Sequence, residues 1–167
     1  MLEHILVDAH GLHAGQKTYP VRVGRAGFTA DKHEGDLKTP VGTFPMRELF
    51  YRPDRFTSAP LTLLRATPLH PHDGWCDDPS HAAYNRAVTL PFSARHEKLW
   101  RDDHVYDLIV PLGYNDGPII PGRGSAIFMH LMRDDGVGTE GCVALKRTDL
   151  LELLAQCSAE TMVEIRG

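Results

Sequence analysis

Two short apolar runs within residues 125–145, SAIFMHLMRDDGVGTEGCVAL, constrain the fold of this chain more than any other feature. The first run, residues 126–129, ends at His130, and the second run, residues 143–145, directly follows Cys142. Apolar runs this short, on either side of a polar loop that contains glycine, are typical of buried β-strands. The pattern therefore predicts two neighbouring strands that bring one imidazole and one thiol to the same edge of a sheet.

A thiol and an imidazole within hydrogen-bond reach form a nucleophile and its base. His130 would take the proton, and the Cys142 thiolate would attack a carbonyl carbon. Gly141 allows the backbone to approach a substrate closely, and the N–H groups of Gly141 and Cys142 would then hold the oxyanion. The alternative interpretation is structural, with Cys142 as a small core residue and His130 as a buried histidine whose hydrogen bonds are satisfied.

Shorter patterns along the chain predict a mainly β fold. Alternating apolar residues indicate strands, and leucines at helical spacing after a serine, threonine or aspartate indicate helices. The expected strands cover residues 2–7, 18–23, 39–46, 88–91, 105–113, 126–130, 142–145 and 161–165. A turn covers residues 10–15, an irregular insertion covers residues 70–86, and residues 61–68 are open to strand or loop. Helices are expected over residues 93–100 and over the leucines after Thr148 or Asp149. This order predicts one domain over residues 1–167, a β-sandwich or barrel-like mixed sheet with one or two helices.

Charge and hydropathy exclude several classes of protein. The net charge is −4 and no basic stripe occurs, so nucleic acid is not an expected partner. The apolar runs are too short to span a membrane. Residues 1–9 do not form a signal peptide, because Glu3, His4 and Asp8 interrupt the apolar stretch. The oligomeric state is not predicted, and three cysteines, with Cys76 in a polar loop, allow at most one disulfide.

Two motifs in the chain resemble those of a known family. His130 is followed by Thr139-Glu140-Gly141-Cys142-Val143, and far upstream stands Thr39-Pro40-Val41-Gly42-Thr43-Phe44. Together they resemble the L,D-transpeptidase catalytic domain of bacteria, also called the YkuD-type domain. The segments Gly74 to Pro79 and Tyr84-Asn85-Arg86 resemble an insertion of the compact subgroup of that family.

This resemblance implies a reaction on peptidoglycan stem peptides. Cys142 would attack an L-to-D bond, either diaminopimelate–D-Ala or L-Ala–D-Glu, and an amine of a second stem would resolve the thioester as a cross-link. No metal or cofactor is needed, and carbapenems would acylate Cys142. The group that orients His130 would be the backbone carbonyl of Leu131, as in relatives, or the carboxylate of Asp134 or Asp135. The substrate implies the cell envelope, with the cytoplasm as the alternative because no signal peptide is visible.

Three departures from the family pattern leave the substrate open. The loop between His130 and Cys142 is short, Glu140 stands where relatives often carry histidine, and Ala144 stands where arginine or asparagine is common. A cysteine L,D-carboxypeptidase or a muropeptide-recycling amidase on the same scaffold is therefore an alternative. A wall-binding module without activity is a third, against which the intact Cys–His pair argues.

Five residues are candidate substrate contacts. Trp75 and Tyr84 would stack on sugar or stem, with plain packing as the alternative. Asn115 follows the strongest strand and would be either a substrate contact or a turn residue. Arg123 would either hold a stem carboxylate or remain solvated. Glu140 is close to the thiol in sequence and would contact the substrate there.

Two charged segments invite other interpretations. The histidines, cysteine and aspartates of residues 70–81 have the composition of a metal site, but their spacing matches no ligand pattern, so the insertion is expected to wall the cleft. Residues 31–36 are expected to be a solvated surface.

Overall fold

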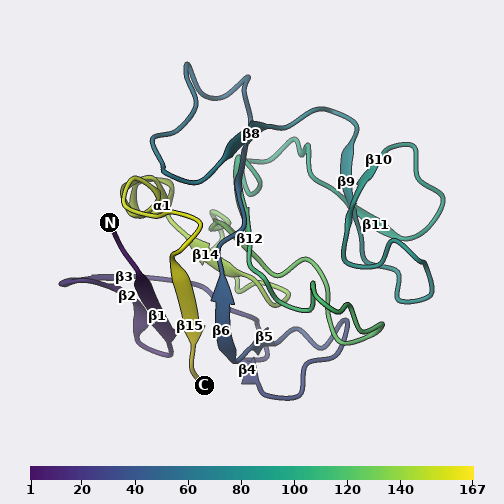
Figure 1. Cartoon of the computed structure of the whole chain (residues 1–167), viewed down its shortest axis with the longest axis horizontal. Helices are drawn as coiled ribbons and strands as arrows, with labels where there is room; N and C mark the ends of the chain where they lie inside the picture. The colour runs from purple at the N-terminus through teal and green to yellow at the C-terminus, as the bar shows by residue number, and fades with distance from the viewer.

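The protein, seen here as a computed structural model that describes residues 1–167, consists of short strands and one helix (Figure 1). The prediction of a mainly β fold with mixed sheets is confirmed, with more strands than expected and a single helix. The elements are β1 (His4–Asp8), β2 (Gly11–Ala14), β3 (Lys17–Tyr19), β4 (Phe28–Thr29), β5 (Thr39–Pro40), β6 (Gly42–Pro45), β7 (Leu49–Tyr51), β8 (Ala66–Pro68), β9 (Asp73–Cys76), β10 (Ala87–Thr89), β11 (His96–Lys98), β12 (Leu108–Pro111), β13 (Phe128–Leu131), β14 (Val143–Leu145), α1 (Arg147–Leu154) and β15 (Met162–Ile165).

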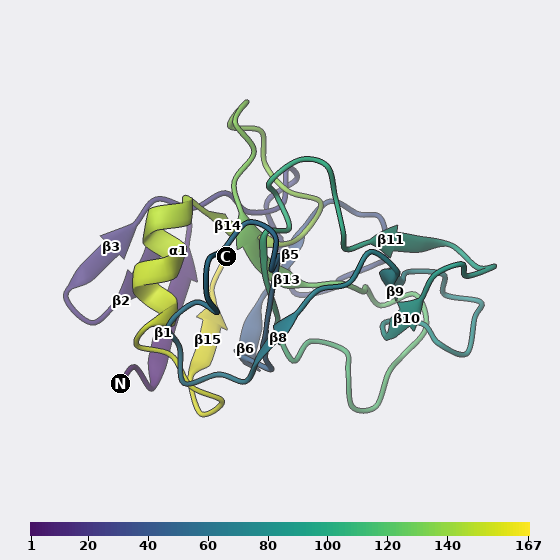
Figure 2. The ribbon, with the colours of Figure 1, turned by 90° about the horizontal axis from the view of Figure 1, so that it is seen from above.

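The strands form two five-stranded sheets and two smaller ones. The first large sheet has the order β3-β2-β1-β15-β6, and the second has the order β14-β13-β12-β7-β8. A three-stranded sheet, β10-β9-β11, and the parallel pair β4-β5 complete the fold. Figure 2 places α1 and β1–β3 at one end of the molecule and β9–β11 at the other. The second large sheet therefore lies in the middle, where both of its faces are covered.

Side chains of β12 and β13 alternate between two apolar clusters. Leu108 and Met129 belong to the main cluster of 22 buried residues, which also contains buried residues of the first large sheet and of α1. Ile109 and Phe128 belong to a second cluster of eight, which includes Cys142. A strand covered on both faces is apolar throughout, which explains the continuous runs in the sequence.

The N-terminal hairpin differs from its expected boundaries. Residues 11–14, predicted as part of a turn, form β2, which pairs with β1 in antiparallel fashion. Leu12 and Ala14 are buried while His13 is half-buried, an alternation that the flanking glycines masked. Gly11 has φ +147, and a Cβ there would lie 2.8 Å from the Tyr19 carbonyl oxygen, so glycine is required at this crossing.

The insertion is more ordered than its composition indicated. Residues 93–100, predicted as a helix, contain β11, which pairs with β9 within the segment predicted to be irregular. Cys76 lies on β9 and is fully buried, rather than in a polar loop. Serine and glutamate spacing favoured a helix locally, but pairing with a distant strand decided the outcome.

Helix α1 carries the leucines expected after Thr148. Leu150, Leu153 and Leu154 are fully buried in the main cluster together with Val143 and Leu145 of β14. The helix thus supports the strand that follows Cys142. No helix of the structure has the length and apolar character that a bilayer crossing requires.

Replacing Leu153 by Ala should lower the free energy of unfolding by about 2–5 kcal/mol, because it opens a cavity in this cluster. Leu61 is 78% exposed, so the same substitution there should change the free energy by less than about 0.5 kcal/mol. Urea denaturation of both variants measures the difference. Similar losses in the two variants would contradict the assignment of α1 to the main core.

Candidate active site

Cys142 lies at the entry to β14, directly beside β13. The two strands are parallel, and their register places Met129 opposite Val143 and His130 opposite Ala144. Cys142 therefore stands beside Phe128, whose N–H donates to the Cys142 Sγ at 3.3 Å. Because alternate residues of a strand share a face, Cys142 and His130 lie on the same face of the sheet, two register positions apart.

His130 is held by the backbone of its own strand. The distance from its Nδ1 to the Leu131 carbonyl oxygen is 2.9 Å, so Nδ1 carries the proton and Nε2 is the basic nitrogen. Asp134 is 94% exposed and lies near His104, while Asp135 pairs with Arg133. Of the three groups that the sequence offered to orient His130, the Leu131 carbonyl is therefore the one that forms the hydrogen bond.

Both members of the pair rest in their neutral forms. Burial raises the pKa of the Cys142 thiol to about 12, and the negative charge of Glu97 adds to this shift. Burial lowers the pKa of His130 to about 4. The thiol donates to the Ala126 carbonyl oxygen at 3.1 Å, so the resting site is not a thiolate–imidazolium pair.

The turn before Cys142 is built around the Thr139 hydroxyl. This hydroxyl accepts the Gly141 N–H at 3.1 Å and donates to the Cys142 carbonyl oxygen at 2.6 Å. Gly141 has φ +140, and a Cβ there would lie 2.9 Å from the Lys38 carbonyl oxygen. The Gly141 N–H is thus used inside the turn, whereas the Cys142 N–H makes no hydrogen bond within the chain. Of the two predicted oxyanion donors, only that of Cys142 is unoccupied.

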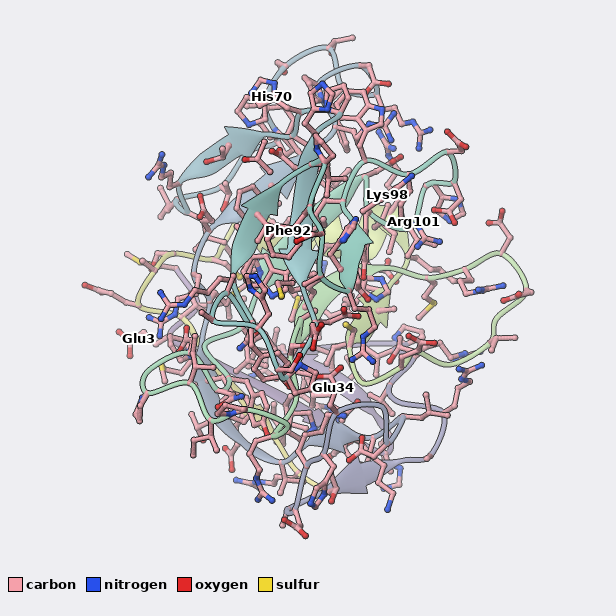
Figure 3. All side chains as sticks on the ribbon, turned by 90° about the vertical axis from the view of Figure 1, so that its right-hand side faces the viewer. Glu3, Glu34, His70, Phe92, Lys98 and Arg101 are labelled. Carbon is pink, nitrogen blue, oxygen red and sulfur yellow. The ribbon has the colours of Figure 1, made fainter.

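Cys142 and His130 line one cleft with a volume of about 470 Å³. The cleft lies between the β13–β14 loop, the segment around residues 32–37 and the β11 region, and its wall carries charges of both signs. Figure 3 looks at the face with β9–β11, on which Arg101 is labelled above and Glu34 below. The basic side chains that line the cleft are Arg25, Lys32, Arg101 and Arg133, and the acidic ones are Glu34, Asp77, Glu97 and Glu140.

Residues 31–36 form only in part the solvated surface that their composition indicated, because Asp31, His33 and Gly35 are exposed but the residues between them are not. Lys32 is only 4% exposed, and its ammonium group pairs with Asp36 next to Gly141. Glu34 accepts hydrogen bonds from the hydroxyls of Tyr84 and Ser125. These ionic contacts anchor the segment to the wall of the cleft, which a local charge pattern does not reveal.

The two aromatic candidates lie outside this cleft. Trp75 packs edge-on against Phe128 at 5.1 Å between ring centroids, and its Nε1 donates to Asn85 at 3.0 Å. It lines a separate pocket of about 370 Å³. Tyr84 is 2% exposed and its hydroxyl is occupied by Glu34 and Gly124, so it has no free face for a substrate. The packing alternative therefore describes Tyr84, and Trp75 does not reach the thiol.

The three polar candidates differ in position. Asn115 has φ +48 and closes its own loop through bonds to Ile120 and Gly124, which matches the turn alternative. Arg123 pairs with Asp31 at 2.8 Å and does not line the cleft. Glu140 does line the cleft, with its side chain 74% exposed.

Sequence reasoning missed residues that the segment after the insertion supplies to the cleft. The pairing of β11 with β9 brings Glu97 to the cleft, which Arg101 also lines. Tyr106 donates its hydroxyl proton to Glu97 at 2.9 Å. The Tyr106 ring also lies edge-on to His130 at 5.3 Å between centroids. The pattern over residues 93–100 favours a helix and so hides the position of Glu97, and the strand expected over residues 105–113 includes Tyr106 without marking it as part of the site. No group of His, Cys, Asp and Glu with metal-binding geometry occurs in the structure.

Neutral His130 makes stability depend on pH. Its folded pKa of about 4 lies below the unfolded value of 6.5, so only the unfolded chain takes up the proton as the pH falls through this window. The free energy of unfolding should fall by up to about 3 kcal/mol from pH 6.5 to 4 through this group. The pKa of Glu97 is raised to about 7 by burial, so its protonation in the folded protein increases the free energy of unfolding as the pH falls.

The His130→Gln variant isolates the histidine contribution, since Glu97 remains in both proteins. The difference in unfolding free energy between wild type and variant should shrink as the pH falls from 6.5 to 4. His70→Gln, at an exposed position labelled in Figure 3, is the matched control. Parallel pH curves for wild type and His130→Gln would show that the folded protein accepts the proton freely.

The fold and this site define a class: a mainly β domain in which a buried cysteine and a buried histidine share a charged cleft. The chain belongs to the YkuD family, whose L,D-transpeptidase catalytic domain profile matches residues 6–165. A comparison with curated proteins gave no match.

Solved structures share the fold at low sequence identity. The helical cell shape determining protein Pgp2 from Campylobacter jejuni aligns with a TM-score of 0.50 and 15% identity over 98% of this chain and 46% of that chain. L,D-transpeptidase 1 of Mycobacterium tuberculosis aligns with a TM-score of 0.45 and 11% identity over 99% of this chain and 59% of that chain. The present chain thus spans about half of the length of these proteins.

Proposed function

We propose that this chain is the catalytic domain of a peptidoglycan L,D-transpeptidase that works in the bacterial cell envelope. Cys142 attacks an L-to-D peptide bond of a stem peptide, and the amine of a second stem resolves the thioester as a cross-link. The observation that supports this most is that Cys142 and His130 share one sheet face and one cleft in a chain of the YkuD family. Residues 1–167 act as a single domain, and no cofactor takes part.

The hydrogen bonds around Cys142 and His130 indicate the order of steps in acylation. The thiol leaves the Ala126 carbonyl and passes its proton to Nε2 of His130, whose Nδ1 is fixed by Leu131. The sulfur then attacks the carbonyl of the L-residue, and the Cys142 N–H donates to the oxyanion. The imidazolium returns the proton to the departing amine of the D-residue. Both groups rest neutral, so the proton moves only when substrate is in place.

Two donor bonds and two kinds of acceptor fit this mechanism. Diaminopimelate–D-Ala and L-Ala–D-Glu are both L-to-D bonds, and the cleft offers partners of both charge signs to stem carboxylates and amines. Water as acceptor would make the domain an L,D-carboxypeptidase or a recycling amidase. Transfer to an amine and transfer to water both start from the same thioester.

Incubation with purified muropeptides, followed by mass analysis of the products, tests the proposal. Cross-linked dimers are the expected result, and the masses identify the donor bond. Shortened monomers would replace the proposal with the hydrolase. An unchanged mixture, together with an unmodified Cys142 after carbapenem treatment, would indicate a wall-binding module instead.

A further inference from the structure

Glu97 is a carboxylate in the cleft of Cys142, and the acylation step does not use it. It lies on β11 opposite Trp75 of β9 and lines the cleft that contains Cys142 and His130. Its Oε2 accepts the Tyr106 hydroxyl at 2.9 Å, and it forms no other side-chain hydrogen bond and no ion pair in the chain. One carboxylate oxygen therefore has no protein partner.

The negative charge of Glu97 disfavours acylation, the first half-reaction. A negative charge near sulfur disfavours the thiolate, and Glu97 is the strongest charge acting on Cys142 in this way. Tyr106 links Glu97 to the base, because its hydroxyl bonds to Glu97 and its ring contacts His130. A group that hinders acylation from within the cleft is better suited to the second half-reaction, in which a cation arrives.

We propose that Glu97 binds the ammonium group of the acceptor stem and removes its proton, so that the free amine can attack the thioester. This inference rests on the proposed transpeptidase function. It assigns the amine acceptor of that reaction to the side of the cleft formed by the β11 region.

The proton balance supports this role. An alkyl ammonium such as that of lysine has a pKa near ~10.4 and arrives protonated. Burial raises the pKa of Glu97 to about 7, the charges of Asp77 and Glu140 contribute to the rise, and the Tyr106 hydroxyl and Arg101 oppose it. Burial keeps the pKa of His130 at about 4, so the carboxylate is the stronger base of the two.

Each bond and proton in the step is accounted for. The ammonium gives one proton to the Glu97 carboxylate, and the resulting amine forms a C–N bond to the thioester carbon as the C–S bond breaks. The second proton of the attacking nitrogen passes through Nε2 of His130 to the departing sulfur. The products are the amide cross-link and the Cys142 thiol, and Glu97 later releases its proton to solvent.

The test measures how the acyl-enzyme is partitioned. Wild type, Glu97→Gln, Glu97→Asp and Tyr106→Phe are acylated with a donor muropeptide, and the thioester is challenged with an amine-bearing acceptor muropeptide or with hydroxylamine, which is largely uncharged at neutral pH. Glu97→Gln should lower cross-linking relative to acylation about 10²-fold but leave interception by hydroxylamine in place. Glu97→Asp and Tyr106→Phe, which keep a carboxylate, should retain more cross-linking than Glu97→Gln.

The pH profile gives a second readout. Cross-linking by wild type should rise with pH through about 7 as Glu97 loses its proton, and this rise should be absent in Glu97→Gln. An equal loss with both amines would overturn the inference, since it would indicate a structural role, and so would an unchanged partition. Absence of any thioester on wild-type Cys142 would overturn the proposed function as well, which separates the two failures.

Discussion

Replacement of Cys142 by Ala should abolish acyl transfer, with a loss of at least about 10⁴-fold, because Cys142 carries the only thiol that lines the cleft with His130. After incubation with a carbapenem, the intact mass of wild type should increase by one adduct, and the mass of the variant should not change. Mass spectrometry and muropeptide analysis measure the two outcomes.

A matched control comes from the main core. Cys157 is fully buried, its thiol donates to the Leu153 carbonyl oxygen at 3.2 Å, and it does not line the cleft. Cys157→Ala should therefore retain the adduct and the cross-linked products. Full activity in Cys142→Ala would remove the nucleophile assignment, and loss in both variants would indicate a general effect on folding.

Replacement of His130 by Gln should lower the acylation rate about 10²- to 10⁴-fold, because the neutral thiol loses the base that accepts its proton. In wild type Nε2 is unprotonated above pH about 4, so the rate of acylation should rise through that pH and then level off. In the variant only the thiolate fraction reacts. Since burial raises the pKa of Cys142 to about 12, that rate should climb about tenfold per pH unit across the neutral range.

Carbapenem acylation followed by mass spectrometry from pH 5 to pH 9 distinguishes the two profiles. His70→Gln removes an exposed imidazole and should follow wild type. A flat profile in His130→Gln, at the wild-type rate, would show that another group accepts the thiol proton.

The central strands were predictable because their signal is local. Buried strands such as β12, β13 and β14 must be apolar on both faces, and this requirement appears directly as continuous runs in the sequence. The leucines of α1 repeat at helical spacing for the same reason. The pairing of His130 with Cys142 in one cleft followed from their places at the ends of two such runs.

The small sheet formed by β9–β11 was not predictable in the same way. Strand β11 has three residues with no apolar alternation, and it exists because β9 pairs with it. That pairing carries Glu97 and Arg101 to the cleft and turns Trp75 toward Phe128 and a different pocket. Lys32 likewise appears as one more surface charge until its ion pair with Asp36 is seen beside Gly141.

The fold class, the central strands and the two side chains that share the cleft can be predicted from the residues alone, because burial on both faces of a strand leaves a local apolar pattern. The folded structure was needed to show that Tyr84 is packed away and that Glu97 lines the cleft of the thiol. Those facts depend on contacts between segments distant in the chain, and such contacts impose no periodicity on the residues that make them.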